Sequence, residues 1–143
     1  HPRRSRGHAT VIVVDASAMI QALVGREVDE SLLDALAGDV AAPHILDIEV
    51  LSVLRGLELG GKLSAPRASE ARQDYFDLLI DRHDAGPLSE RIWGLRHRYT
   101  SYDAAYLALA EALDAPLHTC DAKLASGGHT ALVRVHARAT PPG

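Results

Sequence analysis

The sequence has one cysteine, few aromatic residues and no long apolar segment. The single cysteine, Cys120, excludes an internal disulfide and a zinc site built mainly from thiolates, and it fits a reducing cytoplasm. No apolar run approaches the roughly 20 residues that a membrane-spanning helix needs, so we expect no membrane partner. The net charge of −4 argues against attraction of nucleic acid to the whole surface, but not against a local basic groove.

The apolar residues that are present suffice for one globular domain. The chain has 143 residues, 47% of them hydrophobic, which excludes a disordered chain and fits a single core. We expect this domain over residues 10–137. Residues 1–9 lack the apolar stretch of a signal peptide and are interpreted as a disordered leader or vector remnant, and residues 138–143 as a flexible tail.

Segments typical of strands and of helices alternate along the domain. The run VIVV (11–14) suits a strand that is buried on both faces, and it stops at Asp15. Helical spacing after it predicts helices that begin at 16 and cover 27–37, 45–59, 64–81, 88–99 and 102–113, with a short one ending near 126. Further strands are predicted at 40–43, 83–86, 116–120 and 132–135. This alternation predicts an α/β fold with a mostly parallel sheet.

Acidic residues stand where these segments meet. Asp15 and Asp121 each follow an apolar strand and precede a helix, and parallel strands end at one edge of a sheet, so the two carboxylates can converge. Asp103 lies in the first turn of its predicted helix. A structural role explains each acid taken alone, because aspartate is favoured as a helix N-cap and near a helix N-terminus.

The helix predicted over 45–59 offers two more acids, Asp47 and Glu49. Two positions apart, they point about 200° apart around a helix, so both cannot serve one site. Glu49 shares its face with Ser52 and Gly56, whose small side chains leave room for a cation or a phosphate. This favours Glu49 without deciding between the two.

Together the acids and their surroundings resemble the PIN-domain ribonucleases, closest to the VapC-type toxins of bacterial toxin–antitoxin pairs. The matching stretches are VIVVDASAMI, IEVLSVLRGL and SYDAAYLALAEALDAPLHTCDAKL, in this order, and the likeness runs from about Val11 to Val135. The resemblance implies a three-layer domain, in which helices flank a central, mostly parallel sheet of four to five strands.

The resemblance also implies a metal-dependent endoribonuclease that hydrolyses RNA phosphodiester bonds. It selects Glu49 over Asp47. The implied metal-site and catalytic acids are Asp15, Glu49, Asp103 and Asp121, with Ser17 and Thr119 as supporting hydroxyls. Oxygen ligands favour Mg²⁺, with Mn²⁺ as a substitute, over Zn²⁺. The implied partners are an RNA substrate, a cognate antitoxin protein and a second copy of the chain in a homodimer.

Four convergent carboxylates would need compensation. At a separation of about 5 Å and an effective dielectric constant near 20, each pair repels by roughly 3 kcal/mol. Six such pairs add to about 20 kcal/mol, which exceeds the stability of a small domain. Such a cluster therefore needs a counter-cation or bound protons.

Other functions fit the residues less well. A non-catalytic PIN-like module that binds RNA or a partner would be expected to have lost one of the acids. A haloacid-dehalogenase-type phosphatase needs a second acid where Ser17 stands, and a dinucleotide-binding protein needs glycines after the first strand. None of the eight histidines has a metal-ligand spacing, and His118 is interpreted as a packed side chain.

Positive charge is concentrated in the segment RIWGLRHRY, just before the third acid. Arg91, Arg96 and Arg98 are candidate RNA-binding residues, since phosphate contacts dominate the affinity for nucleic acids. Arg91 and Arg98 would share one flank of the predicted helix, which a solvated helix face explains equally well. Trp93 and Tyr99 are candidates either for base stacking or for packing in the core.

Overall fold

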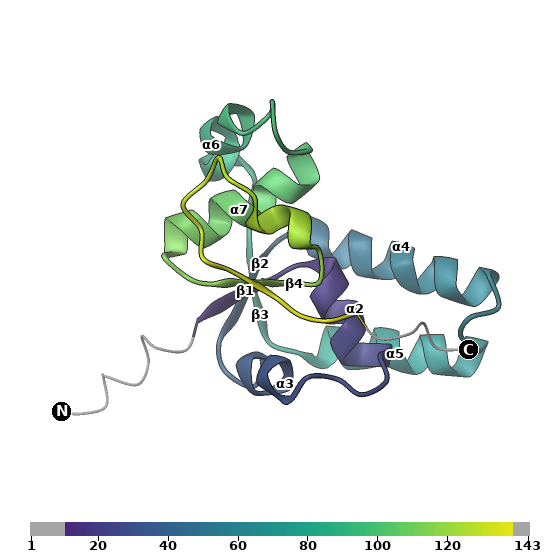
Figure 1. Cartoon of the computed structure of the whole chain (residues 1–143). Coiled ribbons are helices and arrows are strands. Elements are labelled where there is room, and N and C mark those ends of the chain that lie inside the picture. Colours follow the sequence, from purple (N-terminus) through teal and green to yellow (C-terminus); the bar gives the residue numbers. More distant parts are fainter. Residues whose placement is uncertain (1–10, 139–143) are drawn as a thin grey trace.

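The computed structural model describes residues 11–138 (Figure 1). The leader expected over residues 1–9 and most of the tail expected over 138–143 lie outside the described residues. The strands are β1 (Ile12–Val14), β2 (Val40–Pro43), β3 (Ile80–His83), β4 (Leu117–Thr119) and β5 (Val133–Val135). The α-helices are α2 (Ala16–Val24), α3 (Glu30–Leu36), α4 (Ile45–Leu59), α5 (Ala65–Asp77), α6 (Ser89–Gly94) and α7 (Ser101–Leu113). Two 3₁₀ turns, η1 (Gly86–Leu88) and η2 (Ala122–Ala125), complete the chain.

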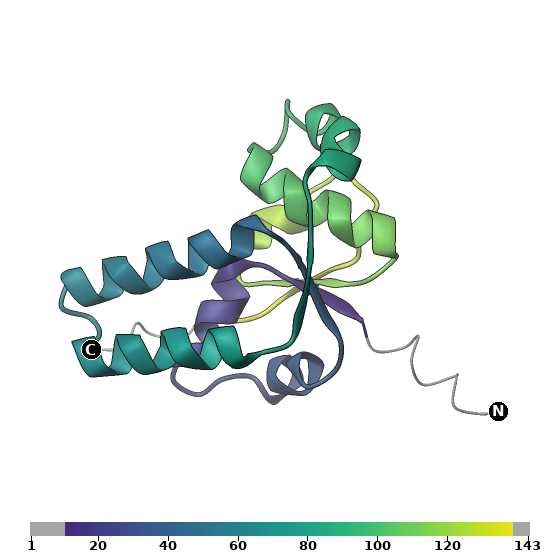
Figure 2. The same ribbon diagram turned by 180° about the vertical axis from the view of Figure 1, so that it is seen from behind.

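The five strands form one parallel sheet in the order β3-β2-β1-β4-β5. In both views α6 and α7 lie on one side of the sheet, whereas α3 and α5 lie on the other (Figures 1 and 2). The predicted α/β layered fold with a parallel sheet is therefore confirmed. Within residues 11–138, no helix is long and apolar enough to cross a membrane.

Strand β1 occupies the centre of the sheet, which explains its unbroken apolar run. Ile12, Val13 and Val14 are all buried, because helices cover both faces and β2 and β4 cover both edges. The edge strands β3 and β5 are more exposed and carry charged residues, among them Arg82 and Arg134. Charge on an edge strand discourages pairing with another chain.

Helix α4 matches its predicted bounds, whereas three other predictions need correction. The helix predicted over 64–81 ends at Asp77, because Ile80–His83 pairs with β2 as a strand instead. The strand predicted over 83–86 was therefore placed too late. The helix predicted over 88–99 ends at Gly94, since glycine is unfavourable in a helix and the following turns carry Leu95 into the core.

Helix α7 begins one residue before its predicted range of 102–113. Thr100 caps the helix, with its Oγ1 accepting a hydrogen bond of 3.1 Å from the backbone N–H of Asp103. This cap fixes the first turn of α7, and Asp103 lies in that turn as expected.

A buried histidine pair joins the last two strands. Nδ1 of His118 lies 2.7 Å from Nε2 of His136, and the two rings stack with centroids 5.0 Å apart. Burial lowers the pKa of His118 to about 4, with the charge of His136 acting in the same direction, so His118 is neutral at neutral pH. The interpretation of His118 as a packed side chain is confirmed.

Candidate active site

The carboxyl ends of β1 and β4 lie side by side at the point where the strand order reverses. Within the sheet, β2 and β3 lie on one side of β1, and the chain then returns to place β4 and β5 on the other side of β1. Open α/β sheets bind ligands at such switch points. Asp15 directly follows β1, and Asp121 comes two residues after β4, so both acids stand at this edge.

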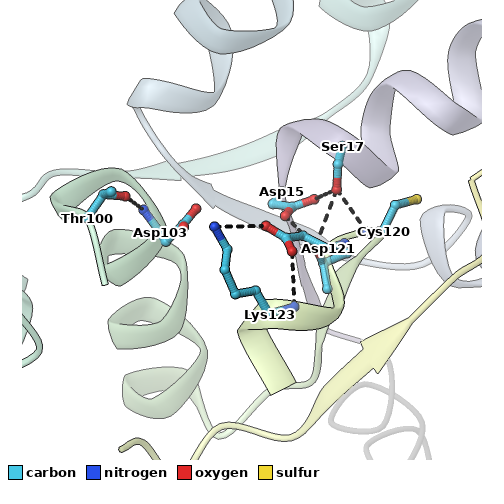
Figure 3. A network of polar contacts seen from close by, with 8 residues as sticks. Asp15, Ser17, Thr100, Asp103, Cys120, Asp121 and Lys123 are labelled. Atoms are coloured by element: carbon cyan, nitrogen blue, oxygen red, sulfur yellow. Dashed lines mark hydrogen bonds and ion pairs between the residues drawn. The ribbon is translucent and has the colours of Figure 1, made fainter. Parts of the chain in front are cut away.

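Asp15 is almost fully buried, with 7% of its surface exposed, and its carboxylate accepts three hydrogen bonds. Oδ1 accepts from Ser17 Oγ at 2.7 Å and from the backbone N–H of Ala18 at 3.0 Å. Oδ2 accepts from Thr119 Oγ1 at 2.5 Å. Asp15 is thus the N-cap of α2, as its simplest interpretation holds, and at the same time a member of a larger polar network (Figure 3).

The two supporting hydroxyls connect Asp15 to the segment that carries Asp121. Ser17 Oγ accepts a hydrogen bond of 2.8 Å from the backbone N–H of Cys120, and Thr119 Oγ1 accepts one of 2.9 Å from that of Asp121. Each hydroxyl therefore donates to Asp15 and accepts from the chain beyond β4. These hydrogen bonds fix the backbone of Cys120 and Asp121 relative to the Asp15 carboxylate.

Asp47 and Glu49 face different neighbours, as the helix geometry predicted. Asp47 accepts hydrogen bonds from Arg82 Nε at 3.0 Å and from the hydroxyl of Tyr75 at 2.6 Å. Glu49 instead accepts a hydrogen bond of 2.5 Å from the hydroxyl of Tyr106 on α7. Asp47 therefore forms a partly buried ion pair with Arg82, away from the other acids.

The four acids influence one another electrostatically. Burial raises the pKa of Asp15, and the charge of Asp121 adds to this effect. Burial likewise raises the pKa of Glu49, against the Tyr106 hydrogen bond, and Asp15 and Asp103 raise it further. The pKa of Asp103 is raised first by burial and then by Asp121 and Asp15. The structure thus brings all four predicted acids into one electrostatic group.

Lys123 supplies the positive charge nearest to these acids. Its Nζ lies 3.9 Å from Asp121 Oδ2, and Figure 3 shows the ammonium between Asp121 and Asp103. The lysine lowers the pKa of Asp103, against the stronger effect of burial. Within residues 11–138, no three acidic, histidine or cysteine side chains stand close enough to hold one ion as they are placed. The acids are therefore grouped more loosely than the 5 Å cluster considered from the sequence.

The donor set nevertheless fits a hard divalent cation. All four acids offer carboxylate oxygens, which Mg²⁺ and Mn²⁺ prefer, and their mutual repulsion favours a bound cation. Asp15 is fixed by its hydrogen bonds, whereas Asp103 and Asp121 are only partly buried. The residues that would hold the ion are Asp15, Glu49, Asp103 and Asp121.

Two contributors to this site, Tyr106 and Lys123, were missed in the sequence. Tyr106 lies three residues after Asp103, which places both on one face of a helix, and this spacing was the available signal. Lys123 lies two residues after Asp121, and only the three-dimensional course of η2 shows that its ammonium faces back toward the acids.

Three side chains of the segment RIWGLRHRY, those of Arg91, Arg96 and Tyr99, make different contacts. Arg91 forms a two-pronged ion pair with Glu111, with distances of 2.7 and 2.9 Å, which lowers the pKa of Glu111 to about 2. Arg96 lies over the ring of Trp93, 4.7 Å from its centroid. Tyr99 is buried and donates to the carbonyl oxygen of Ser126 at 2.9 Å, so it packs in the core.

Comparison with known proteins agrees with this geometry. The PIN domain family model matches residues 12–128. The chain belongs to the PIN-domain family. It is 42% identical to ribonuclease VapC1 of Mycobacterium tuberculosis over 117 residues, covering 80% of this chain and 88% of that protein.

Solved structures share the fold. The crystal structure of PAE2754 from Pyrobaculum aerophilum superposes with a TM-score of 0.64 at 23% identity, over 82% of this chain and 84% of that one. A toxin–antitoxin complex from Klebsiella pneumoniae gives a TM-score of 0.59 at 21% identity, over 81% of this chain and 91% of its counterpart. At these identities the likeness bears on the fold alone.

The raised pKa of Asp103 predicts that Asp103→Asn stabilises the metal-free protein at neutral pH. Near pH 3 and below, which is under the ordinary pKa of an aspartate, the carboxyl is mostly protonated in the folded and the unfolded chain alike, so the substitution has little effect. As the pH rises, the unfolded chain ionises first, and the folded chain loses stability until its own higher pKa is passed. The gain at pH 7.5 should stay below about 1 kcal/mol, because Asp103 is partly exposed.

Urea unfolding in excess chelator, at pH 3 and at pH 7.5, measures this difference. Glu30→Gln is the matched control, since Glu30 is an exposed acid in the first turn of α3, outside the group of four acids. An equal gain in the free energy of unfolding at both pH values, or a loss at pH 7.5, would show that the ionised Asp103 carboxylate does not destabilise the folded protein.

Proposed function

We propose that the protein is the toxin of a VapBC-type toxin–antitoxin pair and acts as a divalent-metal-dependent endoribonuclease. The observation that carries the proposal is the electrostatic group of Asp15, Glu49, Asp103 and Asp121 at the switch point of a PIN-domain sheet. The 42% identity with a VapC ribonuclease supports the same reaction. The alternative, a PIN-like module without catalysis, is not favoured because all four acids are present.

Mg²⁺, with Mn²⁺ as a substitute, would activate a water for attack on the phosphodiester and stabilise charge on the phosphate oxygens. The chain's own residues prepare the site for this chemistry. Ser17 and Thr119 hold the Asp15 carboxylate in one orientation through hydrogen bonds to both of its oxygens. Tyr106 holds Glu49 from α7 through a single hydrogen bond, to Oε1. Lys123 balances part of the negative charge of Asp121.

Replacing any of the four acids by its amide should abolish RNA cleavage while the protein stays folded. Glu49→Gln is the sharpest case, because Asp47→Asn on the same helix offers a matched control in an ion pair away from the site. We expect a loss on the order of 100-fold or more for Glu49→Gln. Asp47→Asn should lower stability but keep activity at temperatures where it is folded. Cleavage of a labelled RNA under single-turnover conditions measures the activity of both variants.

Excess chelator should abolish cleavage by the unchanged protein, and Mg²⁺ or Mn²⁺ should restore it. Hydrolysis in which the activated water displaces the 3′-oxygen leaves a 5′-phosphate and a 3′-hydroxyl, whereas histidine acid–base catalysis without metal would leave a 2′,3′-cyclic phosphate. Analysis of the product ends therefore accompanies the titration. Cleavage that survives chelation, or a cyclic phosphate product, would exclude the proposed mechanism.

Arg91, Arg96 and Arg98 are proposed to guide the RNA toward the acids. Because Arg91 is paired with Glu111, the test should use Arg96→Gln combined with Arg98→Gln, which leaves that ion pair intact. Each lost phosphate contact should lower the slope of log affinity against log salt by about 0.7 for a single strand. Arg55→Gln on α4, which exchanges another exposed arginine, is the control. An unchanged slope in the double variant would move the RNA path to Arg67 and Arg72 on α5.

The proposed protein partners are a cognate antitoxin and a second copy of the chain. A solved toxin–antitoxin complex with the same fold supports the first, and the resemblance to VapC-type toxins supports the second. Light scattering of the purified protein at micromolar concentration should give the mass of a dimer, and co-expression with the product of the adjacent gene should give a larger complex. A strict monomer would contradict the dimer without bearing on catalysis.

A further inference from the structure

A mostly apolar cavity of about 400 Å³ lies at the same end of the sheet as the candidate active site, where Pro43 and His83 end β2 and β3. It is bounded by α6, by the first turns of α7 and by the carboxyl ends of β2 and β3. Trp93 and Tyr102 are among its lining residues, and they expose 66% and 59% of their surfaces. Two large aromatic side chains are thus kept at the surface in one hollow, where burial in the core would have been more favourable.

The cavity and the acids share structural elements. Tyr102 immediately precedes Asp103 in the first turn of α7. His44, at the rim, ends the connection from β2 and immediately precedes α4, the helix that carries Glu49. The carboxyl end of β2 belongs to the same sheet edge as those of β1 and β4. Two of the acids, Glu49 and Asp103, and the cavity are therefore held by the same two helices, α4 and α7, at the same sheet edge.

The charges around the cavity distinguish a base from a phosphate. At its rim, His44 Nε2 lies 3.0 Å from Asp84 and His83 Nε2 lies 3.2 Å from Asp81, and both aspartates are exposed. These carboxylates disfavour a phosphate within the hollow. Arg96, by contrast, lies over the Trp93 ring and offers a cation for the phosphate beside it. Aromatic rings with adjacent arginines are the usual platform for single-stranded nucleic acids.

We propose that this cavity is a base-stacking subsite for single-stranded RNA, in which a nucleobase next to the cleaved bond lies against Trp93 and Tyr102. The proposal rests on the ribonuclease function proposed above and names the form of RNA that the site accepts. Duplex RNA keeps its bases stacked within the helix and cannot offer one to Trp93. Tyr99, the other aromatic candidate in the same segment, is excluded by its burial.

Trp93 is the only tryptophan of the chain, so its intrinsic fluorescence reports on this cavity alone. The probes are ten-nucleotide oligoadenylate and oligouridylate, bound to the unchanged protein in excess chelator and to the Asp15→Asn variant. Fluorescence quenching is measured together with the anisotropy of a fluorescein label on the RNA. We expect saturable quenching with the same midpoint as the anisotropy change, and none with a duplex of equal length.

An abasic nucleotide moved along the oligomer locates the stacked base. One position should abolish the quenching and weaken binding by about 5- to 100-fold, and Trp93→Ala should weaken binding by a similar factor. Trp93→Phe, which keeps a ring, should restore most of the affinity. Phe76→Ala is the control, since Phe76 is a partly exposed aromatic residue on α5, away from this cavity.

Each contrary outcome has a separate meaning. Binding seen by anisotropy without quenching, or full affinity in Trp93→Ala, would overturn the stacking subsite and leave the ribonuclease function intact. A change of oligomeric mass in Trp93→Ala with unaltered RNA binding would assign the cavity to a protein contact instead. Absence of any RNA binding both by the unchanged protein in chelator and by Asp15→Asn with Mg²⁺ present would contradict the proposed function itself, and the subsite with it.

Discussion

The burial of one carboxylate, that of Asp15, is the constraint on which the rest of this structure depends. A charged group at the end of the central strand is tolerated only where hydrogen bonds replace its lost water. The three donors come from Ser17 and Ala18 on α2 and from Thr119 on β4, so the start of α2 and the end of β4 are fixed relative to β1. Thr119 also accepts a hydrogen bond from the backbone N–H of Asp121. The position of Asp121 therefore follows from the hydrogen bonds that replace the lost water of Asp15.

The other two acids reach this edge on helices, and there the chain compensates in a different way. Glu49 and Asp103 are partly buried and lie near other negative charges, which raise their pKa values beyond the effect of burial. Tyr106 relieves Glu49 by a hydrogen bond, and Lys123 relieves Asp103 by its charge. A bound divalent cation, as proposed above, would relieve the remaining repulsion among the four acids.

How much of this was predictable depends on whether a feature is local in sequence. The apolar run of β1, the bounds of α4, and the switch from strand to acid at Asp15 are local patterns, and the structure has them as predicted. The end of α5 at Asp77 is not local, because it is decided by the pairing of β3 with β2. Tertiary contacts also decide two further features. Arg91 forms an ion pair with Glu111, 20 positions along the chain, and the Lys123 side chain points back toward Asp103.

An acidic protein that binds RNA must separate the charges that attract phosphate from those that hold its cation. Here the segment before α7 carries arginines, the sheet edge carries the four acids, and an apolar hollow with Trp93 lies between α6 and α7. Under the proposed function, four carboxylates would repel the scissile phosphate until a cation neutralised them, whereas an uncharged base in the hollow would meet no such barrier. Cation and RNA phosphate would then favour each other's binding, and thermodynamic linkage would make the effect reciprocal. Stacking at Trp93, which involves no charge, should contribute to affinity equally with and without the cation.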